Sequence, residues 1–216
     1  GFSPEEAHQI ARWTREVETM PEVSGRHWVY HEPSLKEPGR RLISRIENIA
    51  PFHAGFAELS GVLRHAAGQL LGEEAVLFKE KVNFKMPGGD GFKPHQDAQA
   101  GWDAYADYFI NVLVCIDEAT PENGCLKVVA GHHKQGLFRS WEPLTEEDMK
   151  GMTFVDCPTR PGDLVFFDSL APHASDPNMT DRTRRLYYAT YNRASAGDHM
   201  ARYYADKHKN YPPDID

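Results

Sequence analysis

Apolar residues recur at helical spacing in two stretches near the start of the chain. The first, residues 4–19, follows Ser3-Pro4, an N-cap serine and a first-turn proline that signal a helix start. The second lies between Ala54 and Leu71 and is closed by Gly72, a typical helix end. Its apolar positions follow steps of three and four: Phe56, Leu59, Leu63, Ala66 and Leu70. We expect an amphipathic helix here that packs against a sheet.

From residue 76 onward the pattern changes to short apolar or alternating runs separated by turn signals such as Pro87-Gly88-Gly89. Five of these runs predict β-strands, at residues 77–84, 109–116, 125–129, 163–167 and 185–191. Short strands with long polar connections favour a mostly β jelly roll with flanking helices, whose barrel holds one small-molecule cavity. Residues 145–150, opened by a threonine, predict a short helix in an insertion.

The length of 216 residues suits a single domain. We divide it into a mainly helical flank at 1–75, a jelly-roll core at 76–192 and a C-terminal extension at 193–216. Because the chain opens directly on a helix start, the question whether an earlier segment of the protein precedes it stays open. The oligomeric state is also left open.

Composition and charge restrict the classes of binding partner that we expect. The net charge of −8 argues against a general nucleic-acid binder, whose footprint would be basic. Cys115, Cys125 and Cys157 are odd in number and lack Cys-x-x-Cys spacing, so neither a disulfide framework nor a zinc ribbon is indicated. No apolar run approaches the roughly 20 residues that cross a bilayer, and no signal-peptide pattern is present. We therefore expect a cytoplasmic protein that acts on a small molecule, without nucleic-acid or membrane partners.

The segment His95-Gln96-Asp97 and the distant His173 form the candidate metal site. Alternate residues of a strand share a face, so a strand carrying His95 and Asp97 points both side chains the same way. His-x-Asp alone arises often by chance, but here each ligand set sits at the end of a predicted strand. Two imidazoles and one carboxylate are the facial triad of non-heme Fe(II) oxygenases, which keeps coordination positions open for co-substrate and dioxygen. Zinc is the competing metal.

The motifs His95-x-Asp97, Pro161-Gly162-Asp163, Pro172-His173 and Arg184 together resemble the phytanoyl-CoA dioxygenase family, over roughly residues 76–192. The resemblance implies a double-stranded β-helix that uses Fe(II), 2-oxoglutarate and O2, with His95, Asp97 and His173 as metal ligands. It also implies hydroxylation rather than halogenation, because the halogenating relatives replace the carboxylate that Asp97 retains here.

Family position implies that Arg184 binds the far carboxylate of 2-oxoglutarate, a role that suits the paired donors of a guanidinium. Arg182 and Arg185 lie close enough in sequence to exchange with it. Asn83 and Lys79, which share a strand face by parity, are expected to hold the other end of the co-substrate. For Lys79 the alternative of a solvated lysine at a sheet edge stays open.

Within the family, residues 78–85, 95–102, 190–192 and 203–207 resemble the bacterial branch that hydroxylates 2-aminoethylphosphonate or its N-methylated relatives. A substrate of that kind needs basic groups for the phosphonate and aromatic or acidic groups for the amine. We assign these roles to Arg45, Arg185 and Trp102, although Arg45 is equally suited to a surface role. Three alternatives stay open: the same chemistry on another small metabolite or an acyl thioester, a zinc hydrolase, and a metal-binding module without turnover.

Overall fold

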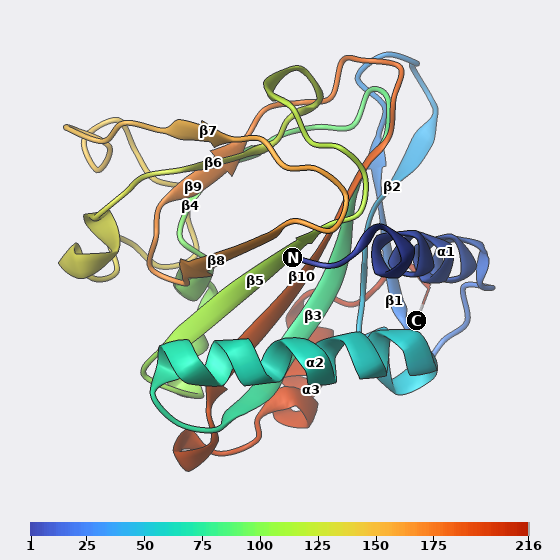
Figure 1. Ribbon diagram of the computed structural model, residues 1–216. Coiled ribbons are helices and arrows are strands. Elements are labelled where there is room, and N and C mark those ends of the chain that lie inside the picture. The colour runs from blue at the N-terminus through green and yellow to red at the C-terminus, as the bar shows by residue number, and fades with distance from the viewer. Residues whose placement is uncertain (216) are drawn as a thin grey trace.

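The computed structural model describes residues 1–215, and two antiparallel β-sheets that face each other form its core (Figure 1). Within these residues the larger sheet has the strand order β1 (Trp28–Pro33), β2 (Arg41–Glu47), β3 (Ala75–Lys85), β10 (Arg184–Arg193), β5 (Phe109–Cys115) and β8 (Leu164–Asp168). The smaller sheet has the order β4 (Phe92–His95), β9 (His173–Ser175), β6 (Leu126–Val128) and β7 (Val155–Cys157). The predicted mostly β architecture with flanking helices is confirmed.

The α-helices are α1 (Pro4–Thr19), α2 (Ala54–Leu71) and α3 (Met200–Asn210). Ser3 caps α1 because its hydroxyl accepts a hydrogen bond from the Glu6 amide, while the Glu6 carboxylate accepts one from the Ser3 amide. Gly72 ends α2 in the left-handed conformation, with φ of 79°. Short 3-10 helices are η1 (Ala50–Phe52), η2 (Asp97–Ala100), η3 (Trp102–Ala104), η4 (Pro121–Asn123), η5 (His132–Gln135) and η6 (Ala194–Ala196). The first two α-helices have the predicted bounds.

Helix α2 covers the outer face of the larger sheet (Figure 1). Phe56, Leu59 and Leu63 are buried there, as predicted. In the last two turns, however, Ala67 and Leu71 are buried in place of Ala66 and Leu70. Steps of four from Leu63 keep these side chains on the face that meets the sheet, whereas steps of three and then four turn the stripe toward solvent.

The inner face of the larger sheet looks toward the smaller sheet. On β3 this face carries Lys81 and Lys85. Their register partners on β10, Tyr188 and Arg184, lie on the same face. The alternate residues face outward, and Val82, which pairs with Tyr187, belongs to the apolar core under α2. The strand parity therefore gathers polar and charged side chains between the two sheets.

The segment 1–75 is less helical than expected, because it also contains the strands β1 and β2. Trp28, Val29 and Tyr30 of β1 are all buried, and β2 joins β1 to β3 through a short pairing at residues 45–47. The larger sheet thus extends beyond the predicted core. Each of these strands is short, and β1 pairs with β2 across a bulge, so their sequence alternation is weak.

Residues 145–150 form turns rather than the predicted helix. The capping contacts exist, because the Thr145 amide donates to the Asp148 carboxylate at 2.8 Å and the Asp148 amide donates to the Thr145 hydroxyl at 3.3 Å. Six residues are too few for a helix to propagate after its costly first turn without a buried apolar face.

Glu80 is a fully buried carboxylate that joins the loop before α2 to β3. Its Oε1 accepts hydrogen bonds from the amides of Ile49 and Ala50, whereas Oε2 has no partner among residues 1–215. Burial raises the pKa of Glu80 from 4.5 to about 7. The native state therefore binds this proton more tightly than the unfolded chain does, and the stabilisation is lost as pH rises through about 7.

We expect Glu80→Gln to remove this pH dependence. A shift of this size corresponds to about 3 kcal/mol between the two protonation states. Relative to the wild type, the variant should gain up to that amount in unfolding free energy as pH rises from 4.5 to above 7, measured by urea denaturation at a series of pH values. Glu58→Gln, at an exposed position on α2, is the control. A difference between wild type and Glu80→Gln that stays constant with pH would contradict the raised pKa.

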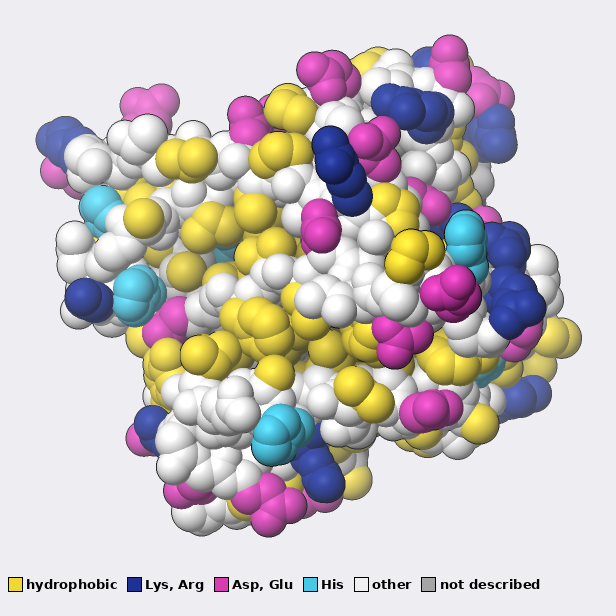
Figure 2. All heavy atoms as spheres, in the orientation of Figure 1, with side chains coloured by type: hydrophobic (Ala, Val, Ile, Leu, Met, Phe, Trp, Pro, Cys, Tyr) yellow, Lys and Arg dark blue, Asp and Glu magenta, His cyan; other side chains and the backbone are white. Residues whose placement is uncertain are grey.

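The three cysteines are free, with Cys115 and Cys125 buried. Among the described residues no helix has both the length and the apolar character that a membrane span requires. On the face shown in Figure 2, lysine and arginine side chains are scattered among acidic ones rather than gathered into one basic surface.

Candidate active site

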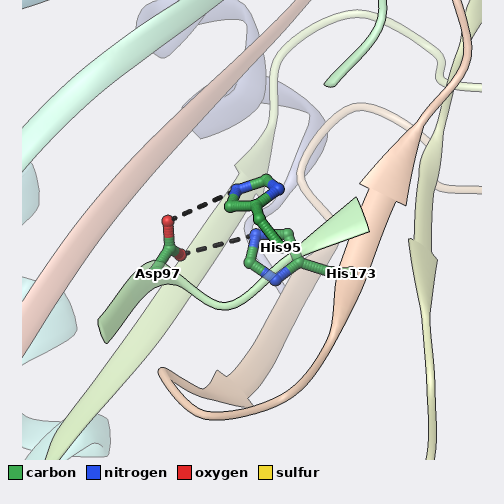
Figure 3. Close-up of side chains that lie close together, drawn as sticks. All are labelled: His95, Asp97 and His173. Carbon is green, nitrogen blue, oxygen red and sulfur yellow. Dashed lines mark ion pairs between the residues drawn. The ribbon is translucent and has the colours of Figure 1, made fainter. Parts of the chain in front are cut away.

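His95, Asp97 and His173 lie together between the two sheets (Figure 3). His95 ends β4 and pairs in register with His173 of the neighbouring strand β9, so the sheet itself places the two imidazoles side by side. His95 Nε2 lies 3.8 Å from Asp97 Oδ1, and His173 Nε2 lies 3.6 Å from Asp97 Oδ2. One potential ligand atom from each residue falls within 4.8 Å of the others, a spacing that one metal ion can bridge.

The approach of Asp97 differs in detail from the prediction. The strand ends at His95, and Asp97 opens the 3-10 helix η2 instead of continuing the strand. A tight turn, rather than strand alternation, therefore carries the carboxylate back toward the imidazoles. Gln96 between them is fully buried, and its amide donates to the carbonyls of Gly136 and Leu170, which fixes the turn.

The ring orientation of both histidines is set by the backbone. His95 Nδ1 lies 2.7 Å from the Lys93 carbonyl, and His173 Nδ1 lies 2.9 Å from the Ala171 carbonyl. A carbonyl only accepts, so each Nδ1 carries the hydrogen and each Nε2 keeps its lone pair toward Asp97. Burial, and then the neighbouring His173, lowers the pKa of His95 to about 4, which keeps this ring neutral.

Two buried polar side chains hold the Asp97 carboxylate. Asn111 Nδ2 donates to Asp97 Oδ2 at 2.9 Å, and Thr190 Oγ1 donates to Asn111 Oδ1 at 2.7 Å. Asn111 and Thr190 are register partners on the adjacent strands β5 and β10. Burial alone would raise the pKa of Asp97, but the electrostatic influence of His173 and then of Lys81 lowers it below its usual value. The carboxylate is therefore ionised and oriented before any ligand arrives.

A small cavity of about 30 Å³ lies on one side of the triad, deep between the sheets. Beyond the triad its walls come from Lys81, Asn83, Phe92, Leu126, Ala174, Ser175 and Tyr188. Asn83 lines this cavity together with the triad, and its role in holding the co-substrate stays a prediction.

Arg184 lies farther along the same inner face and is 1% exposed. Its Nη2 donates to the Gly124 carbonyl at 2.6 Å, but Nε and Nη1 have no partner among the described residues. Its register partner Lys85 donates to Ser175 of the small-cavity wall at 2.6 Å. A buried guanidinium with two free donors is costly unless an anion completes it, so the geometry fits a carboxylate of a bound ligand.

The neighbouring arginines lie outside the site. Arg185 points to the outer face, where its Nε and Nη2 donate to the Asp117 carboxylate at 2.7 and 2.9 Å. Arg182 is exposed and pairs with Glu118. The structure does not bring Arg185 to the substrate cavity, because adjacent residues of a strand face opposite ways.

A larger cavity of about 470 Å³ opens on the other side of the triad, and His95 and Asp97 line both cavities. Trp102 forms part of its wall and is 3% exposed, and Arg45 also lines it. Lys79 points here rather than toward Arg184, and its Nζ lies 3.9 Å from Glu47 Oε2. The structure thus places Lys79 with the two residues predicted to bind substrate.

Sequence reasoning missed several residues of these walls. Lys81 lines both cavities, and burial followed by repulsion from Lys79 lowers its pKa to about 8. Its parity with Lys79 and Asn83 was a usable signal, as was the single polar Asn111 in an apolar run. Glu47 and Lys207 gave no such signal, because only the folded chain brings β2 and α3 together.

Comparison with known proteins relates the chain to one enzyme family and to two relatives that match most of its length. Residues 1–186 match the family model described as phytanoyl-CoA dioxygenase (PhyH). The chain is 38% identical to a 2-aminoethylphosphonate dioxygenase from an uncultured bacterium, over 97% of this chain and 81% of that protein. It is 37% identical to a methylphosphonate hydroxylase from Gimesia maris, over 97% of this chain and 80% of that protein.

Among solved structures, the chain resembles EctD from S. alaskensis with 2-oxoglutarate and 5-hydroxyectoine. The TM-score is 0.77 at 25% identity, covering 90% of this chain and 70% of that one. This likeness confirms the expected jelly-roll fold.

Proposed function

The chain belongs to the phytanoyl-CoA dioxygenase family, and from this premise we propose that it is an Fe(II)- and 2-oxoglutarate-dependent dioxygenase that hydroxylates a small aminoalkylphosphonate at the carbon next to phosphorus. The observation that carries the proposal is the register pair His95–His173 with Asp97, placed between a small cavity and a larger one lined with cations. Two relatives that match nearly the whole chain are named for phosphonates.

The donor set fits Fe(II). Two neutral imidazole nitrogens and one carboxylate oxygen converge, and their hydrogen-bond partners hold them without competing for the lone pairs. The same three residues also suit zinc. Iron with 2-oxoglutarate is favoured by Arg184, because a buried guanidinium with two free donors suits the far carboxylate of 2-oxoglutarate, an anion that a hydrolytic zinc site does not need.

Each group around 2-oxoglutarate then has a role. Arg184 would hold the far carboxylate, with Ser175 and Lys85 beside it. Asn83 and Tyr188 would line the carbon chain, and the cavity of about 30 Å³ would have to widen around the five-carbon acid as it binds. Bound together, Fe(II), 2-oxoglutarate and O2 supply an oxidative decarboxylation that yields succinate and CO2 and hydroxylates a C–H bond.

The residues of this chain position the substrate for that chemistry. His95 and Asp97 line the larger cavity as well as the small one, so a molecule in the larger cavity meets the metal face directly. Trp102 and Tyr105 form an aromatic wall there, and Tyr105, beside the Asp206 carboxylate, is the ring placed to attract a cationic nitrogen. Asn111 keeps the carboxylate of Asp97 in one orientation. A cytoplasmic location belongs to the proposal and is supported by the three free thiols.

The test is coupled turnover. With Fe(II), 2-oxoglutarate and O2, we expect succinate formation to rise on adding 2-aminoethylphosphonate, with one hydroxylated phosphonate formed per succinate. Methylphosphonate and non-phosphonate amines serve as comparison substrates. Succinate formation that phosphonates leave unchanged and another small metabolite stimulates would overturn the substrate assignment but keep the oxygenase.

A further inference from the structure

Three cations surround one buried carboxylate in the wall of the larger cavity. Glu47, at the end of β2, is 1% exposed and pairs with Lys207 of α3. Arg45 Nε lies 2.8 Å from Glu47 Oε1, and Lys79 Nζ lies 3.9 Å from Glu47 Oε2. All four residues line the cavity. We call Arg45, Lys79 and Lys207 the cation cluster.

The cation cluster has more positive charge than its carboxylate can balance. The other acid of this wall apart from Asp97 is Asp206, whose carboxylate is paired with Lys209 at 2.9 Å. Buried charges are stabilised only when they are paired and hydrogen-bonded. Burial lowers the pKa of Lys207 to about 7 even though Glu47 lies in contact with it. An anion in the cavity would supply the missing negative charge.

Aromatic rings limit where the ammonium groups can turn. Lys79 Nζ lies 5.7 Å from the Trp102 ring centroid and 5.4 Å from that of Tyr203, while Lys207 Nζ lies 5.4 Å from that of Tyr30. Each ammonium has three donors, and the contact with Glu47 uses at most part of them. Lys79 also hydrogen-bonds to the Tyr203 hydroxyl, which still leaves at least one donor of each ammonium for a ligand in the cavity.

We propose that Lys79 and Lys207 bind the phosphonate group of the substrate and that they, rather than contacts to the amine, determine which compounds enter. This inference rests on the proposed function and deepens it. Lys79 is the register partner of Thr190, which hydrogen-bonds to Asn111 and through it to Asp97. A phosphonate held by Lys79 therefore lies next to the metal face, and the carbon bonded to phosphorus is the first carbon presented to it.

The other end of the substrate then points toward the cavity mouth. The rings of Trp141 and Tyr211 stack there, with centroids 6.4 Å apart, and both are largely exposed. Tyr105 donates to Asp206 at 3.0 Å on the same wall. Because this region is exposed, the substrate's ammonium group can stay hydrated there and is not required for binding. Both 2-aminoethylphosphonate and methylphosphonate are therefore expected to bind. Taurine, the sulfonate with the same carbon chain and less negative charge, is expected to bind poorly.

The experiment measures binding without turnover. Under anaerobic conditions the protein is loaded with Fe(II) and 2-oxoglutarate, and the visible absorption band of their chelate is recorded. 2-Aminoethylphosphonate and taurine are then titrated by calorimetry and by their effect on the band. Lys207→Met keeps the apolar stem and removes the charge, and we expect it to raise the phosphonate Kd at least about tenfold while leaving the 2-oxoglutarate titration unchanged.

Lys150→Met, at an exposed lysine outside the cavity wall, is the control and should change neither Kd. Three results would overturn the phosphonate subsite while leaving the oxygenase intact. They are a chelate band without phosphonate binding, taurine binding as tight as phosphonate binding, and an unchanged phosphonate Kd in Lys207→Met. Absence of the band in iron-loaded protein would instead overturn the proposed function, and calorimetry on the metal-free protein would then decide the subsite alone. The wild-type comparison of phosphonate with taurine needs no variant.

Discussion

Replacing Asp97 with alanine is expected to abolish Fe(II) binding at the site and, with it, turnover. Asp97 provides the carboxylate between two imidazoles and is held there by Asn111. Loss of an outer partner of a metal ligand typically costs about 10–100-fold in affinity or activity, so loss of the ligand itself should exceed about 100-fold. His95→Ala should have the same effect. Iron content after dialysis and succinate formation are the measurements.

The fold should survive this change, because the side chain of Asp97 faces a cavity rather than the apolar core. Asp103→Ala, at an exposed carboxylate six residues later, is the matched control and should retain iron and activity. Retention of stoichiometric iron and full turnover by Asp97→Ala would mean that the triad does not hold the metal.

Replacing Arg184 with methionine is expected to raise the 2-oxoglutarate concentration needed for half-saturation by roughly 10- to 150-fold. Hydrogen bonds to charged groups contribute about 1.5–3 kcal/mol, and about 1.4 kcal/mol is a tenfold change. The variant loses the two free donors of Arg184 but keeps an apolar chain in its buried position. The measurement is the dependence of succinate formation, or of the chelate absorption, on 2-oxoglutarate.

Arg185→Met is the paired control. Its guanidinium binds Asp117 and Glu18 on the outer face, so the variant can lose stability but should keep its 2-oxoglutarate affinity. If Arg185→Met weakened 2-oxoglutarate and Arg184→Met did not, the co-substrate carboxylate would lie on the other face of β10, and the assignment of the small cavity would be wrong.

Local patterns explain why much of the framework could be predicted from the sequence. The serine cap and Gly72 define the ends of α1 and α2, since both signals act within one turn of the helix. His95 and His173 come together as expected because each lies at the end of a short strand and the two strands pair. Their role as metal ligands remains a prediction, although the geometry agrees with it.

The positions of Asp97 and Lys79 depended on long-range packing, which the sequence pattern does not give. The place of Asp97 follows from a turn fixed by Gln96, whose partners lie at Gly136 and Leu170, far along the chain. The position of Lys79 was predicted from strand parity, which gives the face of a strand but not the end of the cavity that the side chain reaches. Its partner Glu47 comes from β2, an element absent from the prediction.

We propose that the triad and Arg184 together hold Fe(II) and 2-oxoglutarate. Anaerobic titration of the metal-free protein with Fe(II) and then with 2-oxoglutarate tests it most directly, because the visible charge-transfer absorption requires an open iron site and a bidentate keto acid at once. We expect the band to appear with one equivalent of each and to need far more 2-oxoglutarate in Arg184→Met. Protein that binds iron but shows no band at saturating 2-oxoglutarate would contradict the account and favour a zinc enzyme or a binding module on the same fold.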